Sequence, residues 1–352
     1  MDEKLRLAGN TNQLLKLRRI TFRDGKSGGV QAIEFHNQSG LYLTCIEDQC
    51  LNLFDFSYQG VNFAFQSKNG LVSSRFFNGG SSEFGYYWPA GMMYTCGLTN
   101  VGPGVVDEGN YHAEHGRIGM MPAENVSLQK TEKEVILTGT VRDSLLCGYH
   151  MELKRTLTFP IQGKEIQIDD QVTNLEALPA ELMLLYHFNF GYPLLAPGAR
   201  VVKGEGNTID LIHHEQITEN YRQVGQVQEH KKEELYCHTN TPDKQGFGYA
   251  AVVNDKLGLG GYIKYKLDTL PLLIHWKNMC AHDYCVGLEP SNTYIMGRKK
   301  ERENGTLPVL KPYETQTFHT ALGVLEGEEE IFRFEKILKE ISSKECKCRQ
   351  KR

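Results

Sequence analysis

The chain has 352 residues, 40% of them hydrophobic and 23% charged, and this balance excludes an intrinsically disordered protein. Its formal net charge of -4 argues against a nucleic-acid partner, because nucleic-acid binders usually carry a basic excess. No apolar run reaches the roughly 18 residues that cross a bilayer, and the N-terminus lacks the apolar core of a signal peptide. We therefore expect a cytoplasmic protein without a membrane partner.

Nine cysteines are scattered along the chain, and their odd number does not indicate a disulfide framework. A chain of this length buries enough apolar surface to fold without covalent cross-links. We expect the thiols to be reduced, as they are in the cytoplasm.

In chain order, the pattern predicts a short helix within residues 1–18 and then mostly strands. Runs rich in Val, Ile, Tyr, Phe and Thr lie between turn signals such as "RDGKSGG", "FNGGSS" and "VGPG". The clearest hairpin is formed by residues 151–160 and 165–174, two alternating runs around a glycine-containing turn. Helical spacing returns at residues 326–345, where acidic residues come first and lysines later, as the helix dipole favours.

These elements predict an all-β fold, a large and mostly antiparallel sandwich with short helices at the chain ends. No stretch in the middle of the chain has the composition of an interdomain linker. We expect a single domain over residues 1–342 and a basic, loose tail over residues 343–352.

Residues 111–124 form the first of three strand-like stretches that ionisable side chains interrupt. On an extended chain, His115 and Arg117 face the same way, and the glycine between them permits close approach of a ligand. Both side chains are suited to oxygen-rich ligands. His112 and His115 also have H-x-x-H spacing, so zinc is an alternative. The flanking residues favour a loop and a strand over the helix that would align the two imidazoles, and we predict no metal.

The second stretch, "LLYHFNFGYPLL", covers residues 184–195. At a period of two residues, Tyr186, Phe188 and Phe190 fall on one face, while His187 and Asn189 share the other. A lone histidine in a core strand is more often a satisfied structural residue than a functional one. The alternation alone leaves both interpretations open.

The third stretch covers residues 284–298 and contains Glu289 and Arg298. Alternation puts Val286 and Leu288 on one face and Glu289 on the other. A carboxylate among apolar residues is costly unless it is paired or hydrogen-bonded. A structural glutamate at a strand edge fits this pattern as well as a functional one.

Taken in order, residues 96–126, 184–200 and 276–298 resemble the aldose 1-epimerase (galactose mutarotase-like) superfamily, and most of all its less characterised branch. The elements that carry the resemblance are "TCGLTNVG", "HGRI", "LLYHFNFGYP" and "GLEPSN". The resemblance covers roughly residues 30–325. It implies a large antiparallel β-supersandwich with a sugar cleft.

The resemblance also implies roles for individual residues. His187 matches the general acid that protonates the ring oxygen of an aldose, and Glu289 matches the general base on the anomeric hydroxyl. His115 matches a histidine that binds the sugar, and Asn189 is expected to face the same cleft. Arg117 is a candidate contact for sugar, carboxylate, phosphate or sulfonate, with pairing to a nearby acid such as Glu114 as the alternative.

The chain departs from galactose mutarotases in two places. Their early arginine has no clear counterpart, and Arg75 is the best substitute. Their "HGG" is "HGR" here. Trp276 and Arg298 complete the set of expected substrate-binding residues.

The expected function is a carbohydrate isomerase that interconverts sugar anomers by acid/base ring opening at C1. Its expected partner is a small sugar or sugar derivative, it needs no cofactor, and it acts as a monomer or homodimer. One alternative is a non-catalytic carbohydrate-binding protein that uses the same cleft. The other is a lyase or hydrolase that acts on a modified saccharide, since one fold serves several chemistries.

Overall fold

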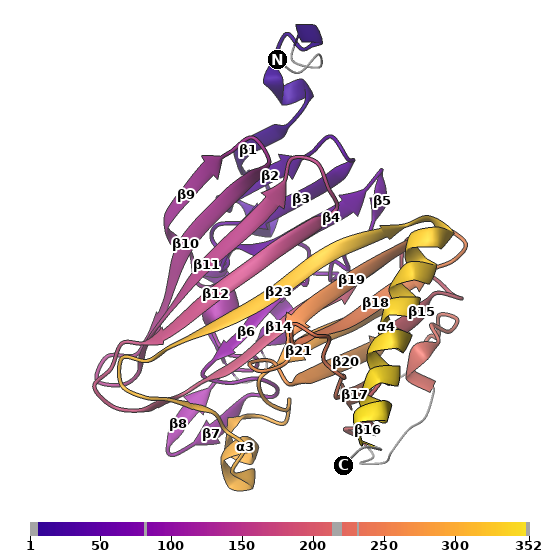
Figure 1. The fold of residues 1–352 in the computed structure, drawn as a ribbon. Helices are drawn as coiled ribbons and strands as arrows, with labels where there is room; N and C mark the ends of the chain where they lie inside the picture. The colour runs from indigo at the N-terminus through magenta and orange to yellow at the C-terminus, as the bar shows by residue number, and fades with distance from the viewer. Residues whose placement is uncertain (1–5, 81–82, 213–219, 231, 350–352) are drawn as a thin grey trace.

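The computed structural model describes residues 6–80, 83–212, 220–230 and 232–349. Two large antiparallel β-sheets dominate this part of the chain (Figure 1). The larger sheet has 11 strands among the described residues. Its order is β1 (Lys16–Thr21), β2 (Gln31–His36), β3 (Leu41–Ile46), β4 (Asn52–Tyr58), β6 (Met93–Leu98), β14 (Met183–Phe190), β21 (Cys285–Ser291), β20 (Leu272–Asn278), β17 (Glu234–His238) and β16 (Thr208–Asp210), with β5 (Val61–Asn62) paired to β4.

The smaller sheet has eight strands in the described part. Its order is β15 (Arg200–Lys203), β18 (Phe247–Asn254), β19 (Leu259–Lys266), β23 (Thr315–Glu326), β12 (Glu165–Asn174), β11 (His150–Pro160), β10 (Glu134–Ser144) and β9 (Glu124–Lys130). Two separate two-stranded sheets are also present: one pairs β13 (Ala180–Glu181) with β22 (Val309–Leu310), and the other pairs β7 (Val105–Asp107) with β8 (Asn110–His112). The predicted hairpin is β11 and β12, which pair from Met151 with Asn174 onwards. The all-β sandwich predicted from the sequence is confirmed.

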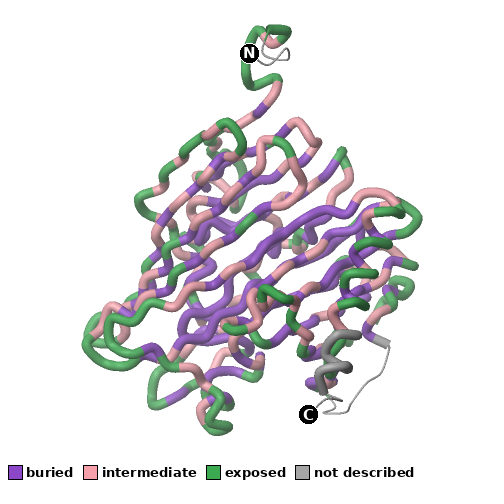
Figure 2. The backbone as a smooth tube through the Cα atoms, in the orientation of Figure 1, coloured by how far each residue is buried: buried purple, intermediate pink, exposed green. Residues whose placement is uncertain are grey.

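The main hydrophobic core lies between the two sheets. β14 contributes Tyr186 and Phe188 to it, while β12 and β23 contribute Ile168 and Phe318. Buried residues run along the strands of both sheets, and exposed residues gather in the connecting loops (Figure 2). A buried ion pair also joins β11 and β12 of the smaller sheet: Arg155 donates to both oxygens of Asp170, at 2.9 and 2.6 Å.

The helices are few in the described part of the chain. Besides the helical residues Arg6 and Leu7, the α-helices are α2 (Phe84–Tyr87), α3 (Arg298–Asn304) and α4 (Gly327–Arg349), and the 3-10 helices are η1 (Thr11–Gln13), η2 (Gly25–Ser27), η3 (Ser74–Phe76), η4 (Ile118–Met120) and η5 (Asn220–Arg222). No helix of the described residues has an 18-residue window apolar enough to span a membrane.

Helix α4 lies across the smaller sheet (Figure 1), where Ile331, Phe334 and Leu338 pack against a cluster that includes Val202 and Val253. The predicted helix is confirmed, but it is 23 residues long rather than short. The helix continues from residue 343, where the basic tail was predicted to begin, to Arg349, and the looseness of this tail stays a prediction. Residues 350–352 lie outside the described part.

Among the described residues, the helix predicted within residues 1–18 corresponds to the helical residues Arg6 and Leu7 and to the single turn η1. β1 then begins at Lys16 and pairs with β2. Pairing in the sheet has overridden the local helical pattern. The extent of the single domain predicted over residues 1–342 stays a prediction.

Candidate active site

The candidate site lies where β14, β21 and β20 are neighbours in the larger sheet. Leu185 of β14 pairs with Ser291 of β21, and Asn189 pairs with Gly287, so His187 stands opposite Glu289. On β20, Trp276 pairs with Gly287. Residues of alternate parity on these strands, such as Phe188 and Leu288, point into the core between the sheets. His187, Glu289 and Trp276 therefore share the opposite face of the sheet.

A pocket of about 290 Å³ opens on that face, and we call it the aromatic pocket. It is lined by Phe84, Trp88, Gly102, Pro103, Glu114, His115, His187, Glu233, Leu235, Trp276, Glu289 and Ile295. The volume is at the lower end of the range for small-molecule sites. Four of the residues expected from the sequence converge there, namely His115, His187, Trp276 and Glu289.

His187 and Glu289 form the innermost polar pair of the aromatic pocket. Nε2 of His187 lies 3.2 Å from Oε1 of Glu289, and the two side chains are 6% and 0% exposed. Neither carboxyl oxygen of Glu289 accepts a hydrogen bond from the described residues. The pair is thus buried, and the carboxyl group of Glu289 is not satisfied by hydrogen bonds from the described residues.

Gly287 makes room for this pair. It lies one strand step from Glu289 on the same face, and a β-carbon there would come within 2.3 Å of Oε1 of Glu289 and 3.2 Å of Cε1 of His187. Real β-carbons do not approach other atoms that closely. The glycine of the "GLE" element therefore leaves the space that the Glu289 carboxyl group occupies, and a side chain there would force that group to move.

Burial shifts the pKa values of the pair in opposite directions. Desolvation raises the pKa of Glu289 well above its ordinary value, with a further contribution from the negative charge of Glu233. Desolvation lowers the pKa of His187 well below its ordinary value, and the neighbouring His115 adds to this. Both shifts favour the neutral forms, a carboxylic acid beside an uncharged imidazole.

Aromatic rings enclose the pair. The Trp88 ring centroid lies 5.1 Å from that of His187 and 5.8 Å from that of Trp276. Phe84 stacks on Trp88 at 5.6 Å. Nε1 of Trp276 donates to Oε2 of Glu233 at 2.7 Å, which fixes the indole at the edge of the pocket.

His115 reaches the aromatic pocket from a tight turn. Its φ is +54° and that of Gly116 is +72°, both in the left-handed region. A β-carbon at Gly116 would lie 1.8 Å from the carbonyl oxygen of Gly97, so only glycine fits there. The His115 ring centroid is 5.9 Å from that of His187, and burial lowers the pKa of His115 to about 4.

Arg117 does not join His115, and the prediction that the two face the same way is wrong. The two left-handed residues reverse the chain, so Arg117 is exposed and its guanidinium lies 5.8 Å from the Phe77 ring centroid. It lines a separate pocket of about 460 Å³, the arginine pocket, together with Asp107, His112 and Arg298. No ion pair joins Arg117 to Glu114 among the described contacts. His112 and His115, weighed as zinc ligands, line different pockets.

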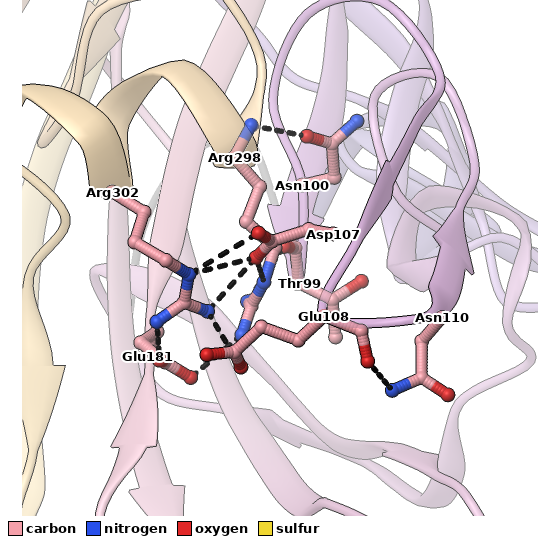
Figure 3. A network of polar contacts seen from close by, with 8 residues as sticks. All are labelled: Thr99, Asn100, Asp107, Glu108, Asn110, Glu181, Arg298 and Arg302. Carbon is pink, nitrogen blue, oxygen red and sulfur yellow. Dashed lines mark hydrogen bonds and ion pairs between the residues drawn. The ribbon is translucent and has the colours of Figure 1, made fainter.

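Arg298 is also absent from the aromatic pocket, because a polar network holds it (Figure 3). It begins helix α3 and pairs with Asp107 at 3.1 Å and Glu181 at 2.6 Å. It also donates to the carbonyl oxygen of Thr99 at 3.0 Å. Arg302 binds the same two carboxylates, and its hydrogen bonds lower the pKa of Asp107. This network fastens α3 to β7 and β13, and Arg298 and Asp107 also line the arginine pocket.

Two further predicted contacts do not line the aromatic pocket. Asn189 is fully buried, and its amide donates to the carbonyl oxygens of Gly91 and His187, both at 2.9 Å. It braces the backbone beneath His187. Arg75 is exposed in η3, and the expectation that it replaces the early family arginine in the cleft is not met by its position.

Eight of the twelve lining residues were not predicted as site members, and three of them bear most on the chemistry of the pocket. Trp88 had one available signal, since it is one of only two tryptophans in the chain and both line the aromatic pocket. Glu233 lies in the charged run before β17, which carries no pattern of its own. Glu114 was noted as an acid but not assigned to the pocket.

The chain matches one described protein family by sequence and several solved structures by fold. The model of the family described as a domain of unknown function (DUF4432) matches residues 27–324, and the chain belongs to that family. No curated protein matches the sequence.

Solved structures agree on the fold. A Klebsiella pneumoniae protein provisionally named an aldose 1-epimerase superposes with a TM-score of 0.85 at 22% identity, covering 94% of this chain and 90% of its own. A galactose mutarotase-like protein from Clostridium acetobutylicum gives 0.62 at 14% identity, covering 90% and 100%. The galactose 1-epimerase of Lactobacillus acidophilus gives 0.60 at 10%, covering 89% and 100%. The predicted resemblance is confirmed, and the fold is galactose mutarotase-like.

Proposed function

We propose that this member of the DUF4432 family is a sugar mutarotase, an isomerase that interconverts the anomers of an aldose. The observation that carries the proposal is the contact between His187 and Glu289 at 3.2 Å inside a pocket walled by Trp88 and Trp276. Aromatic walls suit the apolar faces of a sugar ring. An adjacent acid and base suit a reaction at one carbon.

In the proposed reaction, the carboxylate of Glu289 removes the proton from the hydroxyl at C1 while the imidazolium of His187 protonates the ring oxygen. The bond from C1 to the ring oxygen breaks, and C1 becomes the aldehyde carbon of the open chain. Rotation about C1–C2 presents either face of the aldehyde. Closure returns both protons and gives either anomer. Each positioned acid or base of this kind typically contributes roughly 10²–10⁴ in rate.

The closeness of the two side chains fits this chemistry. The C1 hydroxyl oxygen and the ring oxygen are bonded to the same carbon, so neighbouring groups are able to reach both. The pair also carries the required proton in either form. A carboxylic acid with a neutral imidazole and a carboxylate with an imidazolium hold the same number of protons. Sugar binding needs only to favour the form with a carboxylate and an imidazolium.

His115 has a positioning and binding role in this proposal. Its lowered pKa of about 4 keeps it neutral near pH 7, so it offers a hydrogen bond to a hydroxyl without adding charge beside His187. Asn189 holds the main chain of His187 in place through its 2.9 Å hydrogen bond.

The proposal includes a role in cytosolic sugar metabolism.

The test is anomer equilibration. A panel of freshly dissolved pure anomers is followed by polarimetry, with and without the protein. We expect faster equilibration for at least one aldose, and a slower rate with retained sugar binding for His187→Asn. Binding without acceleration for every aldose would leave the protein as a carbohydrate-binding module and end the mutarotase proposal.

A further inference from the structure

The charge of the aromatic pocket points to a narrower class of ligand than aldoses in general. We propose that the pocket binds a sugar that carries a protonated amine, with Glu114 and Glu233 as the subsite for the ammonium group. The sugar part of this inference rests on the proposed function, and the amine part rests on the charges and rings of the pocket.

The described lining of the pocket contains three carboxylates and no lysine or arginine, the carboxylates being those of Glu114, Glu233 and Glu289. Its two histidines have lowered pKa values and are uncharged near pH 7. Even with Glu289 in the neutral form that burial favours, the described lining still contains Glu114 and Glu233 and no cationic side chain, which disfavours sugar phosphates and sugar acids and favours cations.

No described lysine or arginine lines the pocket beside Glu114 and Glu233, so no cationic side chain of the lining pairs with these carboxylates. Glu114 is half-buried, and its pKa is raised by burial and by the negative charge of Glu233. No hydrogen bond or ion pair of the Glu114 carboxylate occurs among the described contacts. Glu233 is oriented by the 2.7 Å hydrogen bond from Trp276. An ammonium group between these carboxylates would relieve their repulsion.

The aromatic walls supply a second attraction for a cation. Phe84, Trp88 and Trp276 line the same pocket, and aromatic rings attract ammonium groups placed over their faces, most strongly when the ring is that of tryptophan. Glu289 lines the same pocket, and neither of its buried carboxyl oxygens has a hydrogen-bond partner among the described residues, which marks a place where a polar ligand completes the hydrogen bonding.

The arginine pocket provides an internal contrast. There Arg117 and Arg298 accompany Asp107 and Glu108, so cations and carboxylates are mixed. An anionic sugar would find its partners in that pocket, on the other side of the turn at His115. The cation-free lining of the aromatic pocket is thus a local feature rather than a reflection of the net charge of the chain.

The experiment is a tryptophan fluorescence titration, which is specific because both tryptophans of the chain line the pocket. The probes are the amine, the neutral hydroxyl, the N-acetyl and the 6-phosphate forms of glucose and of galactose. We expect the amino sugar of one series to bind about tenfold more tightly than its N-acetyl form, and the 6-phosphate to bind most weakly. Added salt should narrow these differences.

The matched variants locate the effect. Glu114→Gln combined with Glu233→Gln should reduce the preference for the amine to about twofold, because the carboxamides keep the shape and remove the charge. Glu132→Gln, at an exposed carboxylate in the turn between β9 and β10, should keep the full preference. If the double variant does not fold, the unmodified protein still tests the inference, through the salt dependence of binding and the order of affinities among the probes.

Equal or weaker binding of both amino sugars, binding of neither series, or a preference that survives in the double variant would overturn the inference. The titration is independent of turnover. An amine preference without anomer exchange would end the mutarotase proposal alone, while exchange of neutral aldoses without an amine preference would end this inference alone.

Discussion

Two histidine clusters lie on opposite faces of the larger sheet, and adjacent residues of β20 belong to both. Trp276 faces the aromatic pocket with His187 and Glu289. His275 faces the interior between the sheets, where its Nδ1 lies 3.2 Å from Nε2 of His238. His238 in turn contacts the Thr208 hydroxyl through Nδ1 at 2.9 Å.

Both clusters contain buried histidines, but the clusters differ chemically. Desolvation lowers the pKa of His187 and of His238 well below the ordinary value. A depressed histidine pKa is therefore no evidence of catalysis in this fold. His238 and His275 have no exposed surface, and their principal polar contacts are to each other and to a hydroxyl. Only the His187 cluster joins a carboxylate to a pocket that a ligand is able to enter.

The largest effect expected from this contrast is that of Glu289→Gln. Removing the proposed base should slow anomer exchange by roughly 10²–10⁴ without loss of the fold. NMR exchange spectroscopy measures the rate. The matched control is Glu301→Gln, at a buried glutamate of α3 outside the pocket, which should retain the rate within about twofold. An unchanged rate in Glu289→Gln would remove that residue from the mechanism.

The interior cluster should respond in the opposite way. His275→Ala leaves Nε2 of His238 unpaired and opens a cavity in the core, which should cost about 2–4 kcal/mol of unfolding free energy. Because the side chain faces away from the aromatic pocket, the exchange rate should stay within about threefold. Urea unfolding and the same NMR assay give both values. A large loss of rate with unchanged stability would mean that the two faces are coupled.

Acid should destabilise the protein through its buried histidines. Burial lowers the pKa of His275 to about 3 and that of His115 to about 4, so below about pH 6.5 the unfolded chain binds more protons than the folded one. Stability should fall as pH drops through this window, by up to about 1.4 kcal/mol per pH unit and group. Glu289, with its raised pKa, contributes with the opposite sign. His275→Gln should flatten the slope of unfolding free energy against pH between about 6.5 and 4.5, and an unchanged slope would contradict the assignment.

The smallest effect is expected for Arg117→Ala. The side chain is exposed and lies outside the aromatic pocket, so sugar affinity should change by less than about twofold and stability by about 0.5 kcal/mol. Tryptophan fluorescence and thermal unfolding measure these changes. A tenfold loss of sugar affinity would show that the arginine reaches the ligand after all.

Local patterns in the sequence were sufficient to assign side chains to one face of a strand or the other wherever the strand stayed regular. A period of two residues fixed the common face of His187 and Asn189, and it separated Glu289 from Val286 and Leu288. The resemblance to mutarotases then matched His187, Glu289 and His115, which the fold brings to one pocket. The prediction that Arg117 faces the same way as His115 failed because two left-handed residues interrupt the extended chain that the alternation assumed.

By itself, the sequence determined the all-β class, the C-terminal helix and the face on which each strand residue lies, because these follow from short-range periodicity. Only the tertiary structure decided which strands are neighbours. β14 and β21 lie about a hundred residues apart in the chain, and their pairing is what places His187 opposite Glu289. The same long-range packing committed Arg298 to its carboxylate network and assembled the negative lining of the aromatic pocket. Contacts of this kind depend on how the whole chain buries its apolar surface, and no local pattern encodes them.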